Sequence, residues 1–170
     1  MDDPHTESQL LREIWLELNA LCFASALTEP NSIGWIDFSK EGDIKEEFGY
    51  YFTRLNGIAL SHRFQYAEDQ HLQCLQLSSD PTLTVQKKKE ALIKFNAYEI
   101  VYLLMVHEMI HQAAHQAGDS HANHGESFLK HASGAATALG IPAPTLDEAP
   151  QWPDIRNYLA LEFNAGNIRF

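Results

Sequence analysis

The sequence predicts an α+β fold in which a small antiparallel sheet packs against one central helix. Three observations support this class. Residues 98–117 are apolar on most sides, which is typical of a helix buried in a protein core. Asn56 and Gly57 separate an aromatic run from an aliphatic run, which is a good signal for a β-hairpin. Residues 8–27 carry leucine and isoleucine at the three-and-four spacing of an amphipathic helix.

The remaining elements are shorter. In chain order we expect a helix over 8–27, a strand around 33–36, hairpin strands on either side of Asn56-Gly57, a lysine-rich helix over 85–95, the central helix over 98–117, a helix over 126–139 and a short helix around 155–163. Residues 63–83 fit either a strand or a short helix. Because no repeat or boundary divides the 170 residues, we expect a single domain over 1–170.

Composition narrows the class of protein. The net charge is −11, with 12 basic and 23 acidic residues, and such a surface repels phosphate backbones, so we do not expect direct nucleic-acid binding. The two cysteines, Cys22 and Cys74, are far apart and fit buried thiols in a reducing compartment. The acidic start of the chain does not look like a secretory signal, and no apolar run reaches the ~20 residues of a membrane span. We therefore expect a cytoplasmic protein with no membrane partner.

The central helix contains the pattern H-E-x-x-H at His107, Glu108 and His111. Residues four apart on a helix are separated by about 40° of rotation and about 6 Å of rise, so both imidazoles project from one face and can share one zinc ion. Glu108 is turned by about 100° from His107, beside the metal and in reach of a water bound there. Unpaired polar groups in an apolar helix would cost desolvation energy, which favours a metal site over coincidence.

A catalytic zinc site usually has three protein ligands and one open position. His115 lies about 12 Å along the helix from His107, too far to share its ion. The metzincin pattern is absent, because Ala114 and Ala117 replace its glycine and third histidine. The other candidates for the third ligand are Asp119, His121, His124, Glu126 and His131. Among these we favour His124, because Gly125 follows it and a helix begins there.

The stretches "LLMVHEMIH" and "HGESFLKH" resemble the paired motifs of the SprT-like family, the Spartan-type zinc metalloproteases. The upstream stretches "LNALCF", "WIDFS" and "GIALS" match more loosely and stand in the family's order. The resemblance implies a zincin-like metalloprotease domain, with a small sheet packed against the H-E-x-x-H helix. It also implies one Zn²⁺ held by His107, His111 and His124, with Glu108 as the catalytic residue and Phe128 as a core anchor.

The resemblance further implies a zinc-dependent endopeptidase with a protein substrate, which in this family includes DNA-associated or crosslinked proteins. The acidic charge and the lack of a cysteine zinc ribbon depart from the DNA-directed members, and residues 62–96 look longer, as a lid or partner surface would be. Two alternatives stay open: a non-catalytic zinc-binding domain of the same fold, and a protease acting on proteins unrelated to DNA. Candidates for the group that stabilises the oxyanion are Tyr50, Tyr98 and His131.

Overall fold

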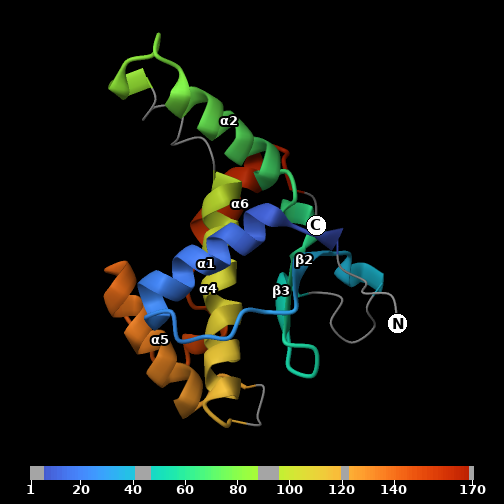
Figure 1. The fold of residues 1–170 in the computed structure, drawn as a ribbon, viewed down its shortest axis with the longest axis vertical. Coiled ribbons are helices and arrows are strands. Elements are labelled where there is room, and N and C mark those ends of the chain that lie inside the picture. Colours follow the sequence, from blue (N-terminus) through green and yellow to red (C-terminus); the bar gives the residue numbers. More distant parts are fainter. Residues whose placement is uncertain (1–5, 41–46, 88–95, 120–122, 169–170) are drawn as a thin grey trace.

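The computed structural model describes residues 6–40, 47–87, 96–119 and 123–168 (Figure 1). Its strands are β1 (Thr6–Glu7), β2 (Ser32–Ile36), β3 (Gly49–Phe52) and β4 (Gly57–Ser61). Its α-helices are α1 (Gln9–Phe23), α2 (Ala67–Ser79), α4 (Asn96–Gln116), α5 (Glu126–Leu139) and α6 (Arg156–Asn164). Three short 3₁₀ turns accompany them: η1 (Phe38–Lys40), η3 (His62–Phe64) and η4 (Ala149–Gln151). The expected α+β class is confirmed.

The four strands form one sheet in the order β1-β2-β4-β3. The hairpin expected around Asn56-Gly57 is present, because β3 pairs with β4 in antiparallel register. Asn56 has a φ of 44°, a left-handed conformation that asparagine tolerates better than most residues. The expectation of a wholly antiparallel sheet was wrong, since β2 and β4 run parallel, from the pair Ser32 and Gly57 to the pair Ile36 and Ser61.

The parallel pair has a physical reason in burial. Every residue of β2 and of β4 is buried, as expected for central strands covered on both faces. The chain leaves β2, forms β3 at the far edge and returns through the hairpin to place β4 between the two. The sheet is therefore mixed, with β3 as one edge strand, and β3 packs against α4.

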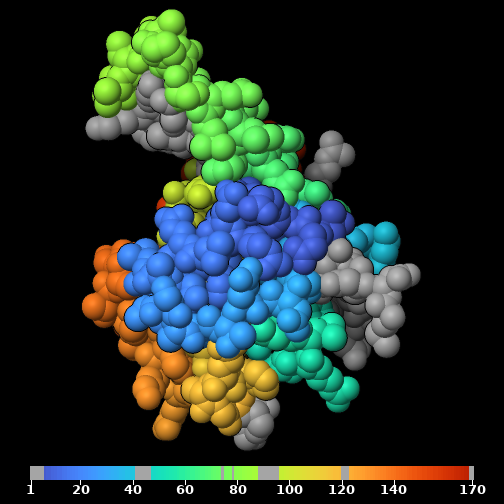
Figure 2. All heavy atoms as spheres, in the orientation of Figure 1, coloured from blue at the N-terminus to red at the C-terminus, as the bar shows by residue number. Residues whose placement is uncertain are grey.

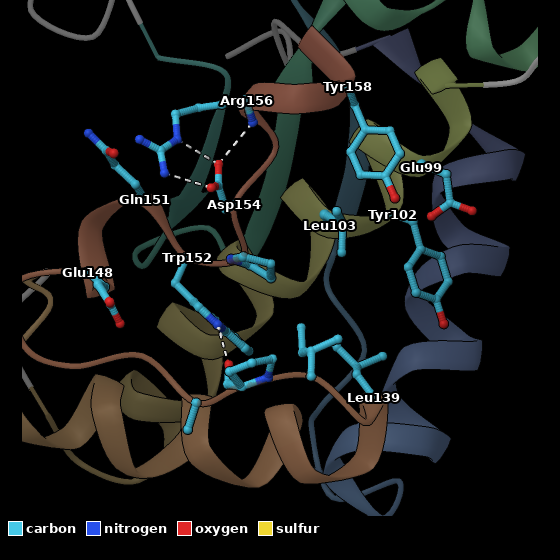
Figure 3. A pocket seen from close by; sticks show the side chains of 14 residues that line it. Glu99, Tyr102, Leu103, Leu139, Glu148, Gln151, Trp152, Asp154, Arg156 and Tyr158 are labelled. Carbon is cyan, nitrogen blue, oxygen red and sulfur yellow. Dashed lines mark hydrogen bonds and ion pairs between the residues drawn. The ribbon is translucent and has the colours of Figure 1, made fainter. Parts of the chain in front are cut away.

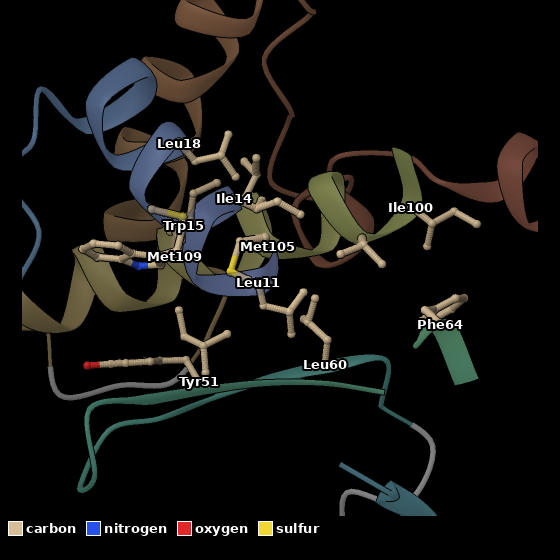
Figure 4. Packing of buried hydrophobic residues seen from close by; sticks show 14 of the residues in the cluster. Leu11, Ile14, Trp15, Leu18, Tyr51, Leu60, Phe64, Ile100, Met105 and Met109 are labelled. Carbon is tan, nitrogen blue, oxygen red and sulfur yellow. The ribbon is translucent and has the colours of Figure 1, made fainter. Parts of the chain in front are cut away.

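The core lies between the sheet and helices α1 and α4 (Figure 4). Side chains of α1 and α4 meet Tyr51 and Leu60 of the sheet in one apolar cluster. The fully buried members from the two helices include Leu11, Ile14, Trp15, Leu18, Ile100, Met105 and Met109. Burial of this many large side chains fixes the position of α4 relative to the sheet.

Helix α1 is shorter than the sequence pattern suggested. Ser8 caps its start, because the Ser8 Oγ accepts a hydrogen bond from the Leu11 backbone N–H at 3.3 Å. Its end comes at Phe23 and not near Leu27, because Ala24 and Ser25 have φ values of 51° and 59° and reverse the chain.

A buried glutamine fixes the rotation of α4 at the residue that follows His111. Gln112 has no exposed surface, and its Oε1 accepts a hydrogen bond from Trp15 Nε1 at 3.0 Å. Its Nε2 donates to the Thr28 carbonyl at 2.8 Å and to Asn56 Oδ1 at 3.1 Å. The helix, α1 and the hairpin turn are thus joined through one satisfied side chain, which holds one face of α4 toward the sheet.

Helix α2 projects from the rest of the molecule (Figures 1 and 2). It resolves the ambiguity over residues 63–83 in favour of a helix. Most of the lysine-rich helix expected over 85–95 lies outside the described residues. In the described part of the chain no helix has the length and apolar character needed to cross a membrane.

Candidate metal centre

Three histidines meet at the C-terminal half of α4 and the start of α5. His107 and His111 lie one turn apart on α4, and His124 comes two residues before α5 begins. The Nε2 atom of His124 lies 3.0 Å from that of His107 and 3.1 Å from that of His111. One nitrogen from each ring thus falls within 4.8 Å of both others. The structure brings together the three residues that the sequence analysis favoured.

The hydrogen bonding of these rings suits a metal better than it suits hydrogen bonds alone. His107 Nδ1 lies 2.6 Å from the Trp152 carbonyl oxygen, which can only accept, so Nδ1 carries the proton and Nε2 presents a lone pair. A neutral His124 has at most one proton on Nε2, and this proton can serve only one of the two contacts that Nε2 makes. A cation among the three nitrogens removes this conflict. Tetrahedral zinc–nitrogen bonds of about 2.0–2.1 Å separate the nitrogens by roughly 3.3 Å, close to what is observed.

Burial keeps these imidazoles neutral, the form that binds a metal. Desolvation lowers the pKa of His107 to about 4 and that of His111 to about 3, and it also lowers the pKa of His124. Repulsion between neighbouring rings, if both were protonated, adds to the lowering of the pKa of His107 and His111. All three rings therefore offer unprotonated nitrogens across the neutral range of pH.

Phe128 packs against all three histidines. It is fully buried in α5, and its ring centroid lies 5.1 Å from that of His107 and 4.8 Å from those of His111 and His124. The three imidazoles therefore pack around one apolar ring, which limits their rotation. This position agrees with the expected role of Phe128 as a core anchor.

Glu108 lies beside the histidines and is 5% exposed. Burial raises the pKa of its carboxyl to about 8, and the nearby Glu47 carboxylate acts in the same direction. A hydrogen bond from the Tyr51 backbone N–H opposes both effects. A carboxyl that titrates near neutral pH can both accept and return a proton, which suits a general acid–base group.

Gly49 on β3 leaves the space that the Glu108 carboxyl occupies. A Cβ atom at position 49 would lie 2.8 Å from Glu108 Oε1 and 2.9 Å from Leu60 Cδ2. Both distances are shorter than van der Waals contact, so a larger residue would displace the carboxyl. The sequence analysis missed this residue, because the contact joins positions 59 residues apart and no local pattern marks it.

For the zinc-dependent endopeptidase that the sequence motifs predict, we expect Gly49→Ala to lower peptide cleavage about 100-fold and to leave the metal content unchanged, because displacing a catalytic group by about 1 Å costs activity of this order. The measurement is kcat/KM together with metal stoichiometry. Gly134→Ala in α5 is the matched control, since a Cβ there meets no atom within 4 Å and should leave cleavage unaltered. Equal activity of both variants would show that the space beside Gly49 is unimportant.

A pocket of about 170 Å³ opens over the cluster. Besides the three histidines and Glu108, residues of β3 and Glu47, His115, Asp119 and Pro150 line it. His115 faces this pocket with its ring 5.9 Å from that of Tyr51, and it is not among the grouped ligands. Of the candidate oxyanion groups, Tyr50 lines the pocket.

The other two oxyanion candidates, Tyr98 and His131, do not line this pocket. Tyr98 stacks on His71 at 5.5 Å, and His131 lines a separate hollow with Cys22. Among the candidates for the third metal ligand, Glu126 is exposed, and His121 lies outside the described residues.

Cys22 is a free thiol. Burial raises the pKa of this thiol to about 11, in line with an unreactive cysteine.

Comparison of the chain with protein-family models, with curated proteins and with solved structures gives no match. Among the described residues, His107, His111 and His124 are the one group of three or more His, Cys, Asp or Glu side chains able to hold a metal ion.

Proposed function

We propose that the protein is a zinc-dependent endopeptidase of the SprT-like type, in a zincin-like domain. The observation that carries this proposal is the convergence of three imidazole nitrogens next to a buried carboxyl on the same helix. Neutral imidazoles suit zinc, and three ligands leave a coordination position open for substrate or water. The resemblance of the sequence motifs to those of the SprT-like family also supports the proposal.

In this mechanism His107, His111 and His124 would hold the ion. Zinc bound there supplies Lewis-acid chemistry, since it polarises a carbonyl and makes water more acidic. Glu108 accepts a proton from the attacking water on its carboxylate and later returns it to the leaving amine. Its raised pKa, about 8, makes the Glu108 carboxylate a stronger base toward the proton of the attacking water. The Trp152 carbonyl holds the His107 ring in the tautomer that binds metal.

The edge of the sheet supports a peptide as the substrate. In the described part of the chain β3 pairs with β4 alone, and its residues Gly49, Tyr50 and Tyr51 line the pocket. A sheet edge can bind an extended peptide through main-chain hydrogen bonds. An unfolded or extended protein segment would thus lie along β3 and present its backbone to Glu108.

A purely structural zinc site is the main rival interpretation. Such a site needs four protein ligands, and the described residues contribute three. It also has no use for a buried carboxyl whose desolvation is unfavourable. The buried carboxyl therefore favours catalysis.

The test is cleavage of an unfolded protein by the purified chain. With one zinc per chain we expect cleavage that a chelator abolishes and added zinc restores. Zinc-loaded protein that cuts no unfolded substrate would overturn the proposed function.

The net charge of −11 opposes direct binding of DNA, so we propose that the substrate protein is recognised without it. We expect cleavage rates that do not rise when single- or double-stranded DNA is added, because the net charge of −11 repels phosphates. The measurement is initial rate against DNA concentration at low and at moderate salt. A salt-sensitive stimulation by DNA would favour a substrate bound to DNA.

A further inference from the structure

A second pocket, of about 310 Å³, opens directly beside the catalytic one. The two share Glu47, Gly49, His107, Glu108 and Pro150. The two pockets therefore adjoin at the Glu108 carboxyl and at one proposed zinc ligand, His107. A side chain in the second pocket would lie next to both groups.

The interior of this second pocket is mainly apolar. Helix α4 contributes Leu103 and Leu104, and Phe48, Trp152, Ile155 and Leu159 complete the apolar surface. Two charged residues at the start of α6, Asp154 and Arg156, are exposed and form an ion pair at 2.8 Å. A mainly apolar interior, in which Asp154 and Arg156 already pair with each other, is suited to an uncharged side chain.

The wall formed by Trp152 is held at both ends of the residue. Its indole Nε1 donates a hydrogen bond to the Pro142 carbonyl at 3.0 Å (Figure 3). Its own carbonyl oxygen lies 2.6 Å from His107 Nδ1. A further hollow of about 580 Å³, drawn in Figure 3, continues beyond it and shares Leu103 and Trp152 with the second pocket. The pocket is therefore preformed and fixed relative to the candidate metal centre.

We propose that this second pocket selects a large apolar side chain, such as leucine, methionine or phenylalanine, on the residue next to the scissile bond. The inference rests on the proposed function and names its specificity. The cavity of about 310 Å³ has room for a side chain of this size, and desolvation of the apolar surface supplies the preference. Aspartate and glutamate are disfavoured, because a carboxylate would lose its hydration in the apolar interior and the lining already contains the carboxyl groups of Glu47 and Glu108.

The experiment uses a peptide library with one randomised position at a time, and mass spectrometry identifies the bonds cut by the zinc-loaded chain. We expect apolar residues over aspartate by at least about tenfold in kcat/KM at one position adjacent to the cut. Leu159→Ala enlarges the pocket and should move the preference toward tryptophan and phenylalanine. Leu159→Phe should move it toward alanine and valine.

Leu161→Phe is the matched control, since Leu161 lies on the same helix, is 55% exposed and lines none of these pockets. Circular dichroism and metal content verify that each variant is folded. Cleavage without an apolar preference, or a profile that the Leu159 variants leave unaltered, would overturn the inference while leaving the endopeptidase proposal intact.

A binding measurement separates the two proposals if no cleavage occurs. Fluorescent peptides that differ by leucine or aspartate at one position are titrated against zinc-loaded Glu108→Gln. Leucine bound at least about tenfold more tightly, and weakened by Leu159→Phe in the same background, supports the pocket even for a chain without protease activity. Equal affinities would overturn the pocket.

Discussion

Replacing Glu108 by glutamine is expected to lower peptide cleavage by about 10²–10⁴-fold, the contribution usual for general acid–base catalysis. Glutamine has nearly the same volume, so it fits the space beside Gly49. Its amide oxygen can still accept the hydrogen bond from the Tyr51 backbone N–H. It cannot take a proton from water. The measurement is kcat at saturating peptide, with metal content and melting temperature recorded on the same sample.

The zinc content of Glu108→Gln should equal that of the natural chain, because the carboxyl belongs to none of the proposed ligands. The thermal stability should not fall, because the substitution removes a carboxyl that burial disfavours in its charged form. Cleavage at the natural rate by this variant would show that another group handles the proton.

Replacing His111 by alanine is expected to weaken zinc binding by more than about 100-fold, beyond the usual effect of losing a group that merely supports a ligand. Only two imidazoles would then remain on the ion. Ligand binding stabilises the folded state by about 4 kcal/mol at 1,000 times the dissociation constant, so the variant should also lose most of its zinc-dependent stabilisation. The measurements are zinc titration against a competing chelator and melting temperature with and without zinc.

His115→Ala is the matched control for this prediction. His115 lies one turn further along α4, faces the same pocket and stays outside the group of three. We expect this variant to bind zinc as tightly as the natural chain. If His115→Ala lost zinc and His111→Ala kept it, the assigned ligand set would be wrong.

Local patterns in the sequence predicted the parts of the site that lie close together along the chain. His107 and His111 follow from helical spacing, since four residues make just over one turn. Gly125 and the helix start after it indicated that the chain reverses near His124, so that this residue can face the first helix of the motif. The apolar surroundings of Glu108 also indicated burial, which the structure confirms.

Pairing of the strands depended on contacts that the sequence does not mark. The pattern of residues 33–36 fits a strand but carries no information on its partner or its direction. The hairpin predicted at Asn56-Gly57 was correct. The prediction that the whole sheet is antiparallel was wrong, because β2 pairs with the buried strand β4 and runs parallel to it. Long-range burial decided this pairing.

Two supporting groups were missed for the same reason. Gly49 matters through the volume it leaves beside Glu108, and Trp152 through a backbone carbonyl that orients His107. A carbonyl oxygen occurs in every residue, so no sequence pattern reveals which one a histidine will meet. Only the packing of the chain around Trp152 against α4 brings this carbonyl next to His107.

A crystal structure of zinc-loaded protein, with anomalous diffraction recorded on both sides of the zinc absorption edge, tests the metal centre most directly. We expect one zinc peak per chain, bonded at about 2.0–2.1 Å to Nε2 of His107, His111 and His124, with the remaining position free of protein atoms. The absence of zinc at these nitrogens, or a fourth protein ligand closing the site, would contradict the account.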